Sequence, residues 1–193
     1  MNQPEGGRGK TRSPVLWGRP TEFGCIDRVL SNRKHMVFLE FGCARIPEAV
    51  KGDGHSTVFL ADLASRTDSE FASCDISRDA IMCAKGLIEK YGIKARLRFI
   101  ESDAFELAKI WDKPLDFLLL DGCAEWPAED GKEFADAHLA VFRELEKWMK
   151  PDSLVMVDDT EVRGKSVIPY MKARGWAEIS LCGPREGAVL RRV

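Results

Sequence analysis

The sequence predicts an α/β fold in which a doubly wound, mostly parallel sheet carries helices on both faces. Short apolar runs alternate along the chain with longer segments whose apolar residues recur at helical spacing. The run at 115–122 is almost continuously apolar up to an Asp-Gly end, as expected for a central parallel strand. Two last runs, 176–181 and 187–191, flank a Gly-Pro turn and predict a closing hairpin.

Length and composition indicate one globular domain. The chain has 193 residues, of which 45% are hydrophobic and 31% charged, with a net charge of −2. Because there is no basic excess, a nucleic-acid partner is not favoured. No apolar stretch approaches the roughly 20 residues of a membrane span, so no membrane partner is expected. Residues 1–13 are polar and glycine-rich, and we interpret them as a flexible tail ahead of a single domain at 14–193.

Six cysteines stand at positions 25, 43, 74, 83, 123 and 182, and no two of them have Cys-x-x-Cys spacing. Several lie inside apolar runs, which is typical of reduced, partly buried thiols. A structural zinc site would need clustered ligands that this pattern lacks. The cysteines therefore favour a cytoplasmic protein.

The first half of the chain gives clear helix and strand signals. Thr21 is a candidate cap for the first helix, and apolar residues at helical spacing follow it. Gly92 is a candidate C-cap for a later helix. The expected elements here are helix 20–33, strand 36–41, helix 56–64, strand 70–77, helix 78–91, strand 96–101 and helix 104–111.

The second half continues the alternation. An amphipathic pattern predicts a long helix at 134–149, and Pro151-Asp152 predicts a turn before the next strand. The expected elements are strand 115–122, helix 134–149, strand 153–157, helix 164–174 and the final hairpin.

A glycine loop after the first strand is the main candidate for ligand binding. In a doubly wound sheet, a ligand lies at the carboxyl end of such a strand, against the following helix. Glu40 at the strand tip would repel a pyrophosphate and would instead accept hydrogen bonds from a cationic or hydroxyl-bearing ligand. Gly42 lets the backbone approach that ligand.

In these residues the chain resembles the class I S-adenosylmethionine-dependent methyltransferases, whose first motif reads acid-x-Gly-x-Gly-x-Gly. Glu40 and Gly42 fit, whereas Ala44 and Ile46 stand where further glycines are usual. The run 52–57 is similar to the helix opening of the small-molecule O-methyltransferase branch. The resemblance covers about residues 36–192 and implies a Rossmann-like sheet of seven strands with the last antiparallel.

The resemblance also implies a set of cofactor contacts. Asp75 matches the acid that takes the two ribose hydroxyls, and Asp103 matches the acid beside the adenine. Each residue has a structural alternative, because an Asp at either position is also suited to capping the next helix. The full set of candidate cofactor-binding residues is Glu40, Gly42, Ser56, Asp75, Ile76, Asp103, Ala104 and Asp121.

Carboxylates follow two strands that should be neighbours, and converging carboxylates need a cation, a basic ligand or a shared proton. Catechol and caffeoyl-coenzyme A O-methyltransferases carry a metal-binding acid after the fourth strand and Asp-Asn after the fifth. Asp121, Asp158 and Asp159 match these positions, with Asp in place of Asn. The resemblance thus implies Mg²⁺ ligands, and the alternative that these acids cap a turn and bind no metal stays open.

The resemblance implies an enzyme that transfers a methyl group from S-adenosylmethionine to an oxygen of a small-molecule acceptor. The catalytic candidates are Asp121, Asp158 and His138, the last a candidate base within a helix where a structural role competes. A nicotinamide oxidoreductase is disfavoured because Gly-x-Gly-x-x-Gly is absent. The alternative function is a non-catalytic nucleoside-binding or interaction protein, which the altered glycine loop favours. The oligomeric state stays open, with a homodimer compatible with the sequence.

Overall fold

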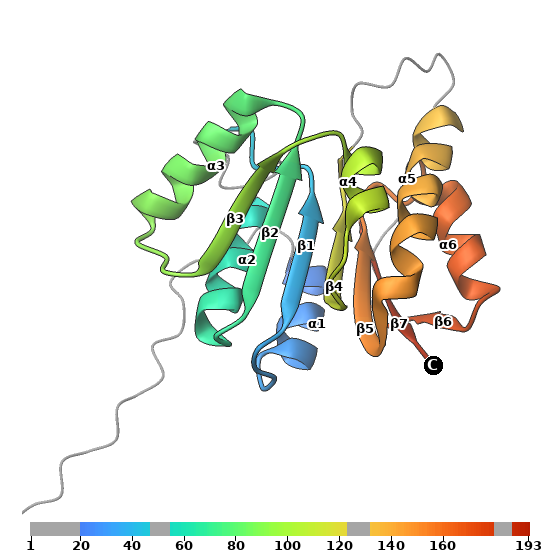
Figure 1. The fold of residues 1–193 in the computed structure, drawn as a ribbon. Helices are drawn as coiled ribbons and strands as arrows, with labels where there is room; N and C mark the ends of the chain where they lie inside the picture. Colours follow the sequence, from blue (N-terminus) through green and yellow to red (C-terminus); the bar gives the residue numbers. More distant parts are fainter. Residues whose placement is uncertain (1–19, 47–54, 123–131, 180–186) are drawn as a thin grey trace, which may run out of the picture.

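The structure is a computed structural model, and it describes residues 20–46, 55–122, 132–179 and 187–193. Helices and strands alternate along the chain (Figure 1). The elements are α1 (Pro20–Leu30), β1 (Val37–Phe41), α2 (His55–Arg66), β2 (Glu70–Asp75), α3 (Arg78–Lys90), β3 (Arg96–Glu101), α4 (Ala104–Ile110), β4 (Leu115–Leu120), α5 (Lys132–Leu145), a 3₁₀ turn η1 (Glu146–Trp148), β5 (Met149–Val157), α6 (Gly164–Lys172), β6 (Trp176–Glu178) and β7 (Ala188–Arg192).

The strands form one seven-stranded sheet in the order β3-β2-β1-β4-β5-β7-β6. Strands β1 to β5 pair in parallel, and β7 runs antiparallel to both of its neighbours, β5 and β6. The predicted α/β class and the antiparallel last strand are therefore confirmed. The carboxyl ends of the parallel strands all lie at one edge of the sheet, the upper edge in Figure 1.

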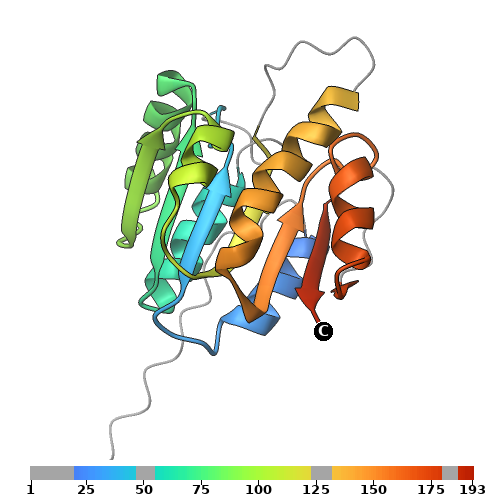
Figure 2. The same cartoon turned by 45° about the vertical axis from the view of Figure 1, so that its right-hand side comes forward.

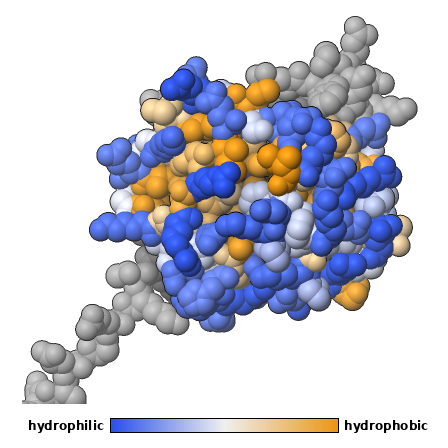
Figure 3. Space-filling view, in the orientation of Figure 1, coloured by the Kyte–Doolittle hydropathy of each residue, from blue (hydrophilic) through white to orange (hydrophobic). Residues whose placement is uncertain are grey.

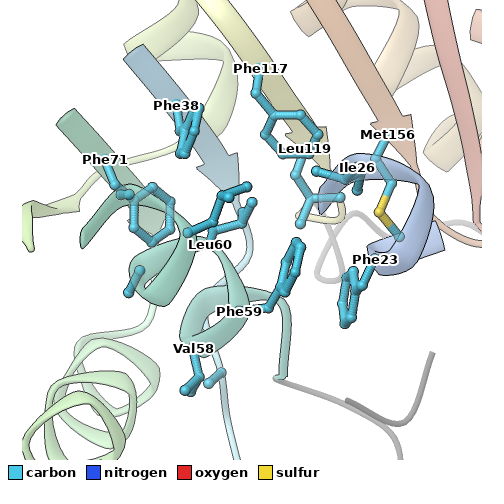
Figure 4. Close-up of a cluster of buried hydrophobic side chains, with 14 of the residues drawn as sticks. Phe23, Ile26, Phe38, Val58, Phe59, Leu60, Phe71, Phe117, Leu119 and Met156 are labelled. Carbon is cyan, nitrogen blue, oxygen red and sulfur yellow. The ribbon is translucent and has the colours of Figure 1, made fainter. Parts of the chain in front are cut away.

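Helices cover both faces of the sheet and enclose two separate cores. One core joins α1, α2 and α3 to alternate strand residues, and the other joins α4, α5 and α6 to the residues between them. In the first core, Phe23 of α1 stacks on Phe59 of α2 with ring centroids 4.4 Å apart, while Phe38 meets Phe117 edge to face (Figure 4). Figure 2 shows α5 and α6 side by side over the other face. The alternation of strand residues between two cores explains why the central strands β1 and β4 are almost continuously apolar.

The first helix ends at Leu30 rather than at residue 33, and the largest error in the expected boundaries lies before β5. The amphipathic pattern predicts a helix to residue 149 and a strand from 153, but α5 ends at Leu145 and β5 already begins at Met149. The cause is pairing within the sheet, because Met149 pairs with Leu115 at the start of β4. Exposed residues at the start of β5, including Pro151, are therefore extended strand rather than turn.

The amino-terminal edge of the sheet is held by an ion network around a buried Asp116 that the sequence pattern does not reveal. The Asp116 carboxylate accepts hydrogen bonds from the Val37 N–H at 2.9 Å, from Arg33 at 2.7 Å and from Lys150 at 2.7 Å. Asp116 is 2% exposed. The donors come from the start of β1, from β5 and from the turn after α1, and together they satisfy both oxygens of Asp116. We therefore assign this edge of the sheet a role in stability rather than in ligand binding.

The surface on the α4 side exposes some apolar area. Helix α4 has only seven residues, and Figure 3 shows hydrophobic residues at the surface beside it. In the part of the chain that the structure describes, no helix is long and apolar enough to cross a membrane. The four cysteines within those residues, at 25, 43, 74 and 83, are free thiols.

Candidate active site

The tips of five parallel strands form a continuous row at the carboxyl edge of the sheet, linked by main-chain hydrogen bonds. Ser102 N–H donates to the carbonyl of Asp75 at 3.1 Å, and Gly42 N–H donates to that of Cys74 at 2.8 Å. Asp121 N–H then reaches the Phe41 carbonyl at 3.1 Å. Neighbouring strands in a sheet lie about 4.8 Å apart. The predicted residues after β1, β2, β3, β4 and β5 are therefore brought together along one edge.

Glu40 lies beneath this edge rather than on it. Its side chain is completely buried, and its Oε2 accepts hydrogen bonds from Ser73 at 2.5 Å and Thr57 at 2.8 Å. The Thr57 hydroxyl in turn accepts from the Ala44 N–H at 3.0 Å. Glu40 thus fixes the backbone after β1 through Thr57, a role that the strand-tip position alone did not indicate.

Burial raises the pKa of Glu40 to about 7, because removing a carboxylate from water disfavours its charged form. The hydroxyls of Ser73, Ser56 and Thr57 oppose this shift. The Glu40 Oε1 atom is buried without a hydrogen-bond partner among the described residues. Protonation of Oε1 would relieve the cost of burying it.

Asp75, the last residue of β2, is the best-organised carboxylate of the row. Its Oδ2 accepts from the Cys43 N–H at 2.9 Å, and its Oδ1 accepts from the Ser77 N–H at 2.8 Å. Arg45 approaches Oδ2 at 3.8 Å. A carboxylate offers about four lone-pair sites. Each oxygen of Asp75 therefore keeps capacity for one further donor, while its orientation is fixed by two backbone contacts.

The helix after β3 starts at another acid of the row. Asp103 caps α4 through Oδ1, which accepts from the N–H groups of Phe105 at 2.8 Å and Glu106 at 3.0 Å. Its Oδ2 makes no hydrogen bond within the described residues, so one side chain has an oxygen for capping and another for a ligand. Ala104, the first residue of α4, is partly buried next to it.

Ile76 lies directly after Asp75 and is 58% exposed. A large apolar side chain exposed at the edge of a sheet is suited to covering the flat face of an aromatic ring. Ser77, and not Asp75, caps helix α3 through its side chain, which accepts from the Ala80 N–H at 3.3 Å. Asp75 is thereby released from the capping role that its position also suggested.

The acids after β4 and β5 hold an arginine between them. Nη1 of Arg163 lies 2.5 Å from Oδ1 of Asp121 and also donates to the Asp121 carbonyl. Nε of the same residue lies 3.5 Å from Oδ2 of Asp159. No group of three or more His, Cys, Asp or Glu residues able to hold a metal ion occurs in the described ranges. The Mg²⁺ expectation is therefore unsupported, because a guanidinium already lies between two of its three predicted ligands.

The remaining predicted residues differ in accessibility. Asp158 is buried at 5% exposure, and its N–H donates to the Leu120 carbonyl at 3.1 Å. His138 lies in α5 and is 1% exposed. Ser56 is the second residue of α2 and is partly buried near Glu40. A general base has to reach the acceptor, so among these groups the partly exposed Asp121 is better placed than His138.

Sequence reasoning missed three contributors to this edge. Ser73 and Thr57 hold Glu40, and their role follows only from strand pairing and helix packing. Arg163 carries one signal that could have been used, since it lies four residues after Asp159 and that spacing places opposite charges together in a helical turn.

Comparisons with known proteins bear on this site. A family model described as a methyltransferase domain matches residues 51–160, more than half of the chain. Curated tRNA 5-carboxymethoxyuridine methyltransferases of Escherichia coli K12 and O157:H7 are 25% identical to it over 122 residues. The match covers 63% of this chain and 41% of each relative, so the chain matches about two fifths of their length.

Solved structures share the fold. An rRNA methylase from Streptococcus thermophilus superposes with a TM-score of 0.64 at 11% identity, covering 92% of this chain and 97% of that one. The methyltransferase PaMTH1 of Podospora anserina, solved bound to SAH, gives a TM-score of 0.60 at 14% identity, covering 81% and 71%. At these identities the likeness establishes the fold, and it confirms the Rossmann-like architecture.

The predicted partner is wrong. We expected a small-molecule acceptor with nucleic acid not favoured, but the names of the curated relatives and of the Streptococcus thermophilus structure specify tRNA and rRNA. The small-molecule acceptor came from the resemblance to O-methyltransferases, and nucleic acid was disfavoured because of the net charge of −2, which averages over the whole surface. Binding of a phosphate backbone depends on where the cations lie, so a small overall charge does not exclude it.

Proposed function

This chain belongs to the methyltransferase domain family, within the class I S-adenosylmethionine-dependent fold, and from that premise we propose that it methylates an RNA. The observation that supports the cofactor is the row of strand tips in which a buried, doubly anchored Asp75 stands beside an exposed Ile76. The RNA acceptor is carried over from the curated relatives, and tRNA is the first acceptor to test.

The donor set of this edge fits S-adenosylmethionine. Asp75 would take the two ribose hydroxyls, because each of its oxygens keeps one acceptor site after binding the N–H groups of Cys43 and Ser77. Ile76 would cover one face of the adenine, and Oδ2 of Asp103 would accept from its amino group. S-adenosylmethionine supplies an electrophilic methyl group on a sulfonium sulfur, which leaves with the electron pair of the broken bond.

The chain's own residues supply position and electrostatics. Glu40, through Thr57, fixes the backbone that approaches the ligand after β1. Asp121 lies at the tip of β4 with its main-chain N–H bound to Phe41 and its side chain held by Arg163. In our proposal Asp121 orients the acceptor and accepts the proton that a nitrogen or oxygen acceptor gives up on methylation.

The test has two stages. Calorimetric titration with S-adenosylhomocysteine measures cofactor binding, and transfer of labelled methyl from S-adenosylmethionine is then measured with total tRNA, with rRNA and with catechol as a small acceptor. We expect label in an RNA fraction that ribonuclease releases. The Asp75→Asn variant serves as the inactive control, and Asp79→Asn, at an exposed position of α3, is its matched control.

The outcomes separate the alternatives. Label transferred to catechol and to no RNA would contradict the proposed acceptor. Cofactor binding with no transfer to any RNA would favour a non-catalytic nucleoside-binding protein. Absence of S-adenosylhomocysteine binding would contradict the assignment of the strand-tip residues to the cofactor.

A further inference from the structure

Arg163 occupies a position between acids of two adjacent strands. Its Nη1 contacts both the side chain and the main-chain carbonyl of Asp121, and its Nε lies 3.5 Å from the Asp159 carboxylate. The Arg163 side chain is 19% exposed, and that of Asp121 28%. Because guanidinium–carboxylate contacts are charge-assisted and this one is shielded from water on most sides, it is stronger than an ordinary surface pair.

The backbone places this arginine. Asp159 adopts a φ of +48°, in the left-handed region that Asp tolerates better than most residues. Its carbonyl then accepts the N–H groups of Val162 at 3.0 Å, Arg163 at 2.8 Å and Gly164 at 3.3 Å. This tight turn begins α6 and returns the Arg163 side chain to the tip of β4. The contact is therefore built into the connection between β5 and α6.

The arrangement does for these acids what a divalent cation would do. A guanidinium carries its charge at every pH that proteins tolerate and presents several N–H donors in a fixed plane. Here it bridges Asp121 and Asp159, offsets one of their two negative charges and holds the end of β4. A metal that used Oδ1 of Asp121 would have to displace the Arg163 guanidinium, which lies 2.5 Å from that oxygen.

Resting on the proposed methyl transfer, we propose that Arg163 is a positioning residue that takes the place of a divalent metal at the β4–β5 edge. It holds Asp121 toward the reacting groups, so that transfer by this chain does not use a metal. The juxtaposition that supports this is the guanidinium between Asp121 and Asp159, fixed by the turn that starts α6.

The test is a titration of the purified protein with Mn²⁺, in which the paramagnetic relaxation of water protons reports how much Mn²⁺ is bound. For the wild-type chain we expect no stoichiometric binding up to about 1 mM Mn²⁺. Arg163→Met removes the guanidinium from between the two carboxylates, and we expect it to bind Mn²⁺ at least about tenfold more tightly than wild type. Arg163→Lys keeps the charge and should bind Mn²⁺ no better than wild type. The double variant Arg163→Met with Asp121→Asn should lose the Mn²⁺ affinity that Arg163→Met gains.

Two results would overturn the proposal. One is a wild-type chain that binds one Mn²⁺ at micromolar concentration and loses it in Asp121→Asn. The other is a folded Arg163→Met protein whose Mn²⁺ affinity equals that of wild type. If Arg163→Met does not fold, titration of the wild-type and Asp121→Asn proteins still shows whether the native site binds a metal. S-adenosylhomocysteine binding, measured on the same samples, reports separately on the proposed function.

Discussion

The backbones of Gly42 and Gly122 are in close contact where β1 and β4 end. A Cβ atom added to Gly42 would lie 3.0 Å from the backbone nitrogen of Gly122, and one added to Gly122 would lie 3.1 Å from that of Gly42. Gly42 also has a φ of +94°. Neither residue can carry a side chain without a backbone shift, so the two strand tips are locked in one relative position at the centre of the site.

Gly42→Ala should therefore destabilise the protein by about 1–3 kcal/mol and weaken S-adenosylhomocysteine binding, because strained φ and backbone contact act together. Urea unfolding and calorimetry measure the two effects. Gly92→Ala is the matched control, since Gly92 has a φ of +64° with nothing within 4 Å of an added Cβ. It should lose some stability and keep its cofactor affinity. Equal losses in the two variants would refute the role of the contact with Gly122.

Glu40 should make stability depend on pH. Its folded pKa of about 7 lies above the ordinary value of 4.5, so the folded state binds the proton more tightly than the unfolded state. The stabilisation from this group is complete below about pH 4.5 and is lost as pH rises through about 7. In Glu40→Gln that dependence should disappear.

The measurement is the free energy of unfolding in urea at several pH values from 5 to 8. Between these limits the wild type should lose up to about 3 kcal/mol relative to Glu40→Gln. Glu89→Gln, at an exposed position of α3, should keep the wild-type profile. Parallel profiles for wild type and Glu40→Gln would mean that Glu40 does not carry a raised pKa.

Asp75→Asn should weaken S-adenosylhomocysteine binding by about tenfold or more. An amide nitrogen cannot accept from the Cys43 N–H or from a ribose hydroxyl, so both the anchoring and the ligand contact are reduced. Calorimetry on folded protein measures the affinity. Unchanged affinity in Asp75→Asn, with Asp79→Asn as reference, would remove Asp75 from the cofactor site.

Asp116→Asn should lower the free energy of unfolding and leave cofactor affinity unchanged. The variant loses the charge that satisfies Arg33 and Lys150 and leaves those cations poorly paired, which should cost about 2–4 kcal/mol of unfolding free energy. Cofactor affinity of the folded protein should not change, because Asp116 lies at the opposite edge of the sheet from Asp75. The exposed Asp112→Asn serves as a control. A loss of affinity in Asp116→Asn would show that the two edges are coupled.

Local patterns were enough to predict the fold. Strands β1 and β4 at the centre of the sheet are buried along almost their whole length, the edge strand β3 alternates, and the helices show apolar residues at helical spacing. The boundary before β5 was not predictable in the same way. Residues 146–149 continue an amphipathic pattern, yet 146–148 form a 3₁₀ turn and pairing with Leu115 draws Met149 into the sheet. Tertiary pairing overrides local pattern where the pattern is weakest, at the ends of elements.

The site was predictable to the level of strand tips and no further. Asp75, Asp103 and Asp121 follow strands whose order the sequence indicates, and the structure places all three along one edge. That Glu40 is buried under Thr57, and that Arg163 returns to Asp121, depend on the packing of residues distant in sequence. The net charge of the whole chain says nothing of where cations lie on its surface, so composition was a poor guide to the partner.

The buried network around Asp116 has a consequence for how such a protein changes over evolutionary time. It fastens the amino-terminal ends of β1 and β4 with contacts that owe nothing to the ligand. Substitutions at the carboxyl edge of the sheet can then alter which molecule is recognised, while the contacts at the amino-terminal edge maintain the free energy of unfolding. A lineage built this way is free to exchange one substrate for another without first having to invent a new fold.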